Sequence, residues 1–162
     1  MTRTFELGDA EVSVPLPEDA ELSELEGLDA GARHLTWAPA PGGHFMLSAG
    51  TSPGHTADGL LAGEAERGSG LRIESDVPVP QVAPGARRVS YSVTRHQPRE
   101  LRATAGGGTA VVPERDVREL SDLLFVPGGI RIGYRVEADA PAELRARLAA
   151  ILDRVAVRSR GG

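Results

Sequence analysis

The fold is decided by the stretch LSDLLFVPGGIRIGYRV, residues 120–136. Two apolar runs, LSDLLFV and IRIGYRV, flank a Pro-Gly-Gly turn, and this arrangement predicts a β-hairpin. In the second run the apolar side chains alternate with Arg131, Gly133 and Arg135. Because successive side chains of a strand point to opposite faces, this alternation predicts a strand with one face toward the core and one polar face.

Alternating patterns predict two more hairpins upstream. Residues 4–16 alternate on both sides of a Gly-Asp turn, and residues 34–48 alternate on both sides of a Pro/Gly loop. Each stretch therefore predicts two antiparallel strands. In the second hairpin His34, His44 and Ser48 occupy positions that alternate with the large apolar side chains.

Three segments lie between these hairpins and residue 120. Residues 87–95 give the cleanest strand pattern, because valine and tyrosine alternate with polar residues. Residues 71–82 alternate only in part and contain two prolines, which predicts a sheet edge because proline cannot donate to a ladder. The polar stretch 96–119 includes three consecutive glycines and predicts an irregular or mobile loop, bounded by a short strand near Leu101.

Helical spacing occurs in three places. The acidic residues 17–31 carry leucines three apart and predict a short helix. Thr56 is a suitable N-cap for a second helix, which Gly68 ends. Pro141 fits the first turn of a third helix, whose apolar stripe is expected to pack on the sheet. The stripe consists of Leu144, Leu148, Ile151, Leu152 and Val155.

The order of elements predicts the fold class. Antiparallel strands with helices set between and after them indicate an α+β protein, in which an antiparallel β-sheet is flanked by helices as an α/β/α sandwich. The 162 residues, 40% hydrophobic and 25% charged, fit one globular domain that needs no disulfide or structural metal. We therefore expect a single domain over residues 1–162.

Composition narrows the function classes. The chain has no cysteine, which excludes disulfides and a thiolate nucleophile. The N-terminus lacks the apolar stretch of a signal peptide and no window approaches a membrane span, so a cytoplasmic protein without membrane insertion is expected. All 18 basic residues are arginine, as in proteins from GC-rich bacterial genomes. The net charge of −5 argues against nucleic acid as a partner.

Catalytic and metal-binding patterns are absent from the sequence. The four histidines form neither an i,i+4 helical pair nor a His-x-His strand pair, so no metal or other cofactor is expected; they are His34, His44, His55 and His96. Ser48 lacks the upstream glycine that a nucleophile elbow requires. The sequence thus predicts that the protein is not an enzyme.

One basic cluster is a candidate binding site. Arg88, Arg95, Arg99 and Arg102 follow one another with a single acidic residue among them. Guanidinium groups bind carboxylates through paired hydrogen bonds, so the cluster is interpreted as a contact for an acidic partner surface or for the acidic N-terminal part of this chain. Residues 1–30 form an acidic segment with nine carboxylates against one arginine, and a solvated loop or a partner-facing edge both explain it.

Several short motifs, taken together, resemble a known family. They are Val12-Ser13-Val14-Pro15-Leu16-Pro17, the hairpin over 33–48, the helix after Thr56, Ile132-Gly133-Tyr134-Arg135-Val136, and a last helix ending Ile151-Leu152-Asp153-Arg154-Val155. This combination is similar to the PsbP-like α/β/α sandwich superfamily. The resemblance implies work as an adaptor, assembly factor or chaperone, and it implies no shared catalytic residues.

Two functions from different classes follow. The first is a non-catalytic protein-binding adaptor or chaperone-like module with an unidentified partner protein. The alternative is a small-molecule carrier of the helix-grip type, in which a curved sheet wraps a helix around an apolar cavity. A filled core favours the first and a large apolar pocket the second. An enzyme would require a cleft in which a histidine meets a carboxylate.

Overall fold

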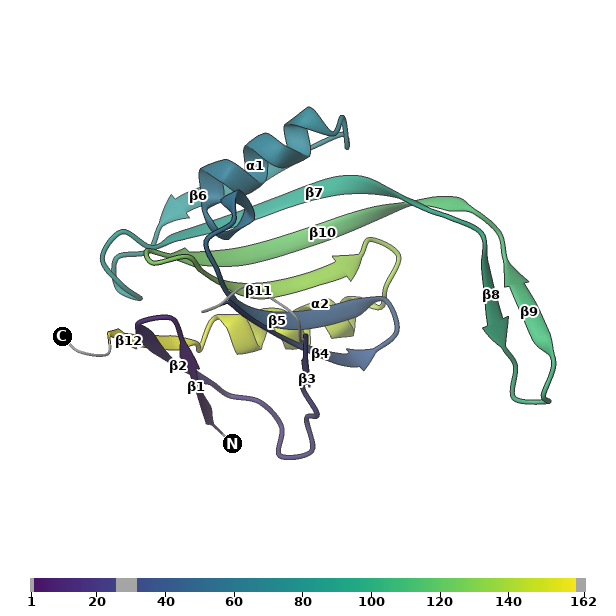
Figure 1. Ribbon diagram of the computed structural model, residues 1–162, viewed down its shortest axis with the longest axis horizontal. Coiled ribbons are helices and arrows are strands. Elements are labelled where there is room, and N and C mark those ends of the chain that lie inside the picture. Colours follow the sequence, from purple (N-terminus) through teal and green to yellow (C-terminus); the bar gives the residue numbers. More distant parts are fainter. Residues whose placement is uncertain (1, 26–31, 160–162) are drawn as a thin grey trace.

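The computed structural model describes residues 2–25 and 32–159. Its strands form a seven-stranded sheet in the order β3-β4-β5-β11-β10-β7-β6, a three-stranded sheet β1-β2-β12 and a two-stranded ribbon β8-β9 (Figure 1). All strand pairs are antiparallel. The strands are β1 (Arg3–Leu7), β2 (Ala10–Val14), β3 (Ser23–Glu24), β4 (Arg33–Ala40), β5 (Gly43–Ala49), β6 (Arg72–Pro78), β7 (Arg87–Gln97), β8 (Glu100–Ala103), β9 (Thr109–Val112), β10 (Arg115–Val126), β11 (Ile130–Glu137) and β12 (Ala156–Ser159). The helices are the 3₁₀ turn η1 (Pro53–His55), α1 (Ala57–Glu66) and α2 (Ala142–Leu152).

The predicted hairpin of β10 and β11 is confirmed and lies at the centre of the large sheet. β11 pairs with β10 on one side and with β5 on the other. Its turn requires glycine, because a Cβ atom on Gly129 would lie 2.0 Å from the carbonyl oxygen of Gly50, and Gly129 has a φ of 78°. The amide of Gly50 in turn donates to the Gly129 carbonyl. This contact fixes the turn against the end of β5.

One face of the large sheet is covered by α2 and by the small sheet (Figure 1). Leu148 from α2, Val12 from β2 and Ile132 from β11 are all fully buried in this layer. The predicted helix ends at Leu152, three residues before the end of its apolar stripe. Val155 is buried beyond the helix end and leads into β12, a strand that the helical spacing concealed.

The opposite face is covered by α1 only over β7 and β10. Leu60 of α1 packs with Val89, Tyr91 and Phe125 in a second apolar cluster. Thr56 caps the helix as predicted, because its hydroxyl accepts a hydrogen bond from the amide of Gly59 at 3.1 Å. The part of this face formed by β4, β5 and β11 carries polar side chains instead.

The stretch 96–119 differs from the predicted loop. β7 and β10 continue past the body of the protein, and the ribbon β8-β9 projects from their far end (Figure 1). The consecutive glycines occupy the turn of this ribbon: the Gly107 amide donates to the Thr104 carbonyl, and the Thr104 amide donates to the Gly108 carbonyl. The short strand predicted near Leu101 is confirmed as β8, whereas the four residues of β9 were too few for alternation to reveal. We call β8-β9 with its turn the arm.

The α/β/α sandwich prediction was wrong. Half of the described residues are in strands and 16% are helical, so the fold is β-rich, with three sheets and two α-helices in its described part. The physical reason is that the N-terminal hairpin forms a separate sheet and fills much of a layer expected to be helical. No helix forms between residues 17 and 25, where β3 lies, and the remainder of that predicted helix falls outside the described residues. Neither α-helix has the length and hydropathy that crossing a membrane demands.

Candidate functional site

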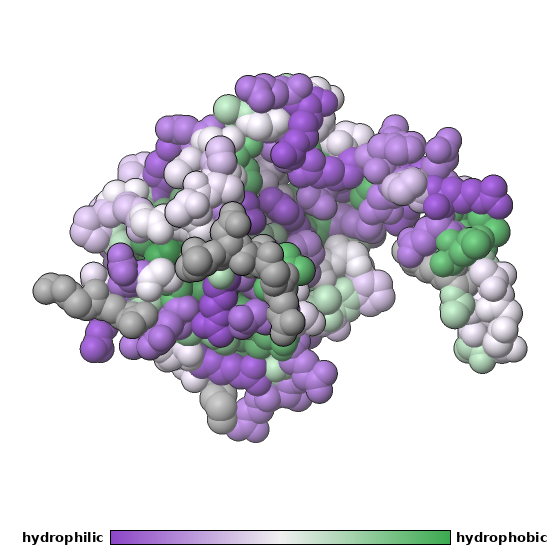
Figure 2. All heavy atoms as spheres, viewed as in Figure 1, coloured by the Kyte–Doolittle hydropathy of each residue, from purple (hydrophilic) through white to green (hydrophobic). Residues whose placement is uncertain are grey.

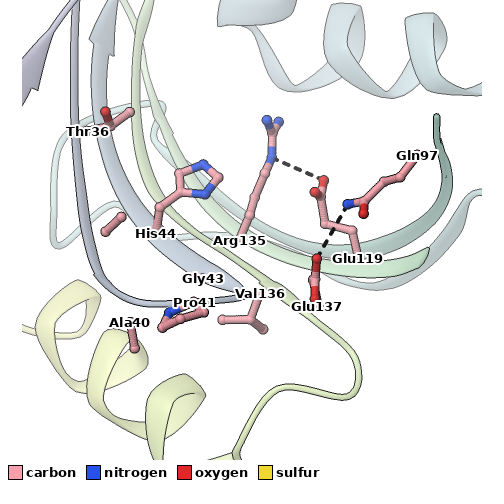
Figure 3. Close-up of a pocket in the computed structure, with 12 residues that line it drawn as sticks. Thr36, Ala40, Pro41, Gly43, His44, Gln97, Glu119, Arg135, Val136 and Glu137 are labelled. Carbon is pink, nitrogen blue, oxygen red and sulfur yellow. Dashed lines mark hydrogen bonds and ion pairs between the residues drawn. The ribbon is translucent and has the colours of Figure 1, made fainter. Parts of the chain in front are cut away.

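A cavity opens on the sheet face that α1 leaves uncovered. It has a volume of about 540 Å³ and lies against the ends of β4, β5 and β11 (Figure 3). Polar side chains from five strands line much of it: Thr36, His44, Gln97, Glu119, Arg135 and Glu137. In Figure 3 the side chains of His44 and Arg135 rise from neighbouring strands, and Arg135 reaches toward Glu119.

Strand pairing places polar side chains of this face in two rows. In the first row Ser48 stands between His34 on β4 and Arg131 on β11. In the second row Arg135 stands between His44 on β5 and Ser121 on β10, and Ser121 is next to Tyr91 on β7. Directly paired residues point to the same face, so these rows form one surface, which we call the His/Arg face. Its members are His34, His44, Ser48, Tyr91, Ser121, Arg131 and Arg135.

The two arginines of the His/Arg face have few partners. Arg131 donates one hydrogen bond from Nη1 to the carbonyl of Gly54 at 2.8 Å, and no carboxylate of the described residues pairs with it. Arg135 donates from Nη2 to the Tyr91 hydroxyl at 3.2 Å, while its Nε lies 3.8 Å from Glu119 Oε1. The Nε atoms of both arginines are buried without a hydrogen-bond partner.

A serine hydroxyl on the same surface is also unsatisfied. Ser121 is 3% exposed and its Oγ makes no hydrogen bond. A buried hydroxyl without a partner costs free energy, and most buried polar groups in native proteins are paired. Three unsatisfied polar atoms on one face therefore call for an explanation that the packing alone does not provide.

The histidines of this region are held toward their neutral form. Burial, followed by the charges of Arg131 and Arg135, lowers the pKa of His34 below its usual 6.5. Burial and the Arg135 charge lower the pKa of His44, and burial and the Arg131 charge lower that of His55. Burial and the Arg135 charge likewise lower the pKa of Arg131. The region is thus electropositive and only partly solvated.

Ser48 and His55 form a close pair beside the His/Arg face. Ser48 Oγ lies 2.7 Å from His55 Nε2, and Ser52 Oγ lies 2.8 Å from His55 Nδ1. This arrangement has the connectivity of a nucleophile, a base and an orienting group. However, Ser48 is 2% exposed, so a substrate carbonyl has no path to its Oγ. The pair instead attaches η1 to β5.

The described residues form no cluster of side chains that could bind a metal ion. No group of three or more His, Asp or Glu side chains in residues 2–25 and 32–159 is arranged to hold an ion. His96 meets a carboxylate, since its Nδ1 is 3.0 Å from Asp116 Oδ1, but both side chains are exposed near the base of the arm and no cleft surrounds them.

The structure does not bring the four predicted arginines together. Arg88 points to the α2 side and binds Asp122 and Asp153, with Nε and Nη2 both on the Asp122 carboxylate. Arg95 points to the α1 side and binds the buried carboxylate of Glu64 at 2.8 Å. Both guanidinium groups are therefore occupied within the molecule.

The other two arginines lie at the arm. Arg99 is exposed just before β8, and no described residue pairs with it. Arg102 belongs to β8, and its side chain lies outside the described part. The predicted cluster is thus divided between internal ion pairs and the arm.

The sequence did contain a signal for the His/Arg face. His34, His44, Ser48, Arg131 and Arg135 all occupy the polar positions of alternating patterns. The missing information was the strand order, because only the pairing of β5 with β11 joins these positions into one surface. Ser121 lies in an apolar run and gave no signal.

Comparisons with known proteins add no relative. No family model, curated protein or solved structure matches the chain. The resemblance to the PsbP-like superfamily therefore stays a prediction.

Proposed function

We propose that the protein is a non-catalytic protein-binding module of the adaptor or chaperone-like type, and that the arm contacts its partner. The observation that carries this proposal is an exposed apolar pair on the arm. Leu101 and Val111 are directly paired across β8 and β9, and they are 67% and 50% exposed. Figure 2 shows apolar side chains gathered on the arm, away from the body of the protein.

The physical argument concerns the stability of a two-stranded ribbon. An isolated ribbon is marginally stable in water, and it gains stability when one face packs against another surface. On the arm, that face carries two large apolar side chains which the protein itself leaves uncovered. A partner that covers Leu101 and Val111 would remove apolar area from water and order the ribbon at the same time.

Two further features support a protein as the partner. β6 is the edge of the large sheet and is exposed along its whole length, so its unpaired backbone groups can accept an added strand. Arg99 stands at the base of the arm, where an acidic group beside an apolar segment would pair with it. The expected partner segment is therefore apolar with a flanking carboxylate.

The helix-grip alternative requires an apolar cavity between the last helix and the sheet. In the described residues Leu148 is fully buried and Leu152 is 4% exposed at this position, and both belong to the main core cluster. A pocket of about 320 Å³ opens beside the C-terminal end of α2, but Leu148 fills the space between the body of the helix and the sheet. This packing favours the protein-binding module.

The test uses opposite faces of the arm. We would compare proteins captured from a lysate of the source cells by the tagged wild type, by Leu101→Glu/Val111→Glu and by the control Ala110→Glu. Ala110 is exposed and pairs with Arg102, so it lies on the other face of the ribbon. We expect a stoichiometric partner to be lost from the double variant and kept by Ala110→Glu. Equal recovery by all three proteins would contradict the proposal.

A further inference from the structure

We propose that the His/Arg face is a binding site for a small oxyanion, a phosphate or carboxylate group held by Arg131 and Arg135. This inference is independent of the arm and of any protein partner. It rests on charge balance, on unsatisfied donors and on the neutral histidines around them.

On the α1 side of the sheet, one arginine has no carboxylate partner among the described residues. On this side of the sheet Arg95 pairs with Glu64, and Arg135 shares Glu119 with Arg95. At the end of the cavity Arg115 lies 3.6 Å from Glu137. Each of these three carboxylates therefore already has a basic partner.

Among the described residues of this face, Arg131 is the arginine that has no carboxylate partner. It lies on the same face of β11 as Arg135, four residues away, and the charge of Arg135 disfavours its own. A partly buried charge without a counter-charge is costly. An anion on this face would supply the missing charge.

The unsatisfied donors point to an oxyanion. Arg131 and Arg135 each have a buried Nε–H with no hydrogen-bond partner, and the Ser121 hydroxyl is buried and unpaired next to Arg135. Guanidinium Nε and Nη groups bind the oxygen atoms of carboxylates and phosphates in pairs. An oxyanion would bind the part-exposed guanidinium groups of Arg131 and Arg135, and it would reach the three unpaired atoms, which are closed to solvent, only after these side chains shift.

The sheet surface between the two arginines forms an apolar floor. Gly133 separates them on this face, and a Cβ atom there would lie 2.8 Å from Cδ2 of Leu123 and 2.1 Å from the carbonyl oxygen of Asp122. No side chain fits at position 133, and Leu123 with Met46 fills the floor. Such a floor strengthens charge–charge attraction above it, because it excludes water from one side.

The titratable groups that face this site are few. Arg131 and Arg135 extend from β11, His34 and His44 from β4 and β5, His55 from η1, Glu119 from β10 and Tyr91 from β7. Each neutral histidine supplies one hydrogen-bond donor and one acceptor. A bound anion would favour protonation of these histidines by solvent, and this would add positive charge to the site. Affinity for an anion whose own charge stays constant should therefore rise as the pH falls below 6.5.

The experiment is a calorimetric titration of the full chain at constant ionic strength, with inorganic phosphate and with succinate as separate probes and chloride as the background anion. We expect at least one probe to bind the wild type. Arg131→Gln and Arg135→Gln should each weaken that binding by about tenfold or more, since a hydrogen bond to a charged group is lost. The probe that binds more tightly identifies the group.

The matched control is Arg118→Gln. Arg118 is also an arginine without a carboxylate partner in the described residues, but it donates to Ser92 and Thr94 on the α2 side of the sheet. Its replacement should leave affinity unchanged. Arg131→Lys keeps the charge and the fold while losing Nε, and should also weaken binding. No heat with either probe, or equal loss in Arg118→Gln, would overturn the proposal.

Discussion

The two faces of the large sheet differ in how their buried polar groups are paired. On the α2 side, buried polar groups are paired: Arg88 binds Asp122 through two hydrogen bonds, and Ser92 accepts from Arg118 at 2.7 Å. On the His/Arg face, Arg131 has no carboxylate and Ser121 has no partner within the described residues. Natural proteins tolerate such unsatisfied groups chiefly where binding requires them. This difference supports the proposal that the His/Arg face binds a ligand.

The largest effect is expected from the α2 side. Leu148→Ala removes a fully buried side chain from the main core, and large-to-small core substitutions of this kind cost about 2 to 5 kcal/mol. Equilibrium denaturation monitored by circular dichroism measures the loss. Leu101→Ala on the arm is the control and should change stability by less than about 0.5 kcal/mol, because Leu101 is exposed. A similar loss in both variants would contradict the assignment of the core.

The next effect concerns Glu64, a carboxylate that is 3% exposed on the α1 side. Burial opposes its ionisation, but the hydrogen bond and charge of Arg95, with Ser69 and Arg67, lower its pKa overall. Arg95→Glu would leave this carboxylate beside a like charge and should cost about 2 to 3 kcal/mol, less than a fully buried pair because Arg95 is part-exposed. Denaturation of Arg99→Glu is the control, and its midpoint should move little.

This expectation replaces a simpler one. The sequence shows Arg95 beside a strand and suggests an exposed group that binds a partner. The structure gives it an internal role that requires residues 31 positions apart to meet. If Arg95→Glu were as stable as Arg99→Glu, the ion pair would be unimportant and Arg95 would again be a candidate for partner binding.

A smaller effect distinguishes the His/Arg face by pH. The pKa values of His34, His44 and His55 are lowered by folding, so below pH 6.5 the unfolded chain binds more protons than the folded one. The free energy of unfolding should therefore be highest above about pH 6.5. It should fall as the pH drops below 6.5 and through the lowered pKa values of the folded protein. Arg131→Gln removes a nearby charge and should flatten this slope.

Denaturation midpoints between pH 5 and 8 test this expectation. The control is again Arg118→Gln, which is on the other face and should keep the slope of the wild type. A slope that both arginine variants leave intact would show that Arg131 does not act on the histidines.

The sequence predicted strands well and their order poorly. Alternation identified β5 and β11, and local turn chemistry identified the hairpin between β10 and β11, because both signals act within a few residues. The layer above the sheet depended on long-range pairing of β12 with β2, which brings Val157 beside Val12. No local pattern specifies that contact, so the second layer was assigned to helices.

The same limit explains what was predicted of the sites. The basic cluster was inferred from nearness in sequence, but Arg88 and Arg95 occupy positions of opposite parity on β7 and so point to opposite faces. The His/Arg face was missed because Ser48 and Arg131 are paired neighbours only after the chain has folded. Parity along each strand was available from the sequence, whereas adjacency between strands was not.

The smallest expected effect compares two serines of equal burial. Ser92 and Ser121 are each 3% exposed and lie on opposite faces of the sheet. Ser92→Ala removes the acceptor of Arg118 and should cost about 1 kcal/mol, whereas Ser121→Ala removes a hydroxyl without a partner and should be neutral or slightly stabilising. Denaturation measures both. If a shift of Arg135 brings the Ser121 hydroxyl to the bound anion, Ser121→Ala should weaken phosphate or succinate binding while Ser92→Ala should not. If Ser121→Ala were as destabilised as Ser92→Ala and kept its anion affinity, the proposed difference between the two faces would be contradicted.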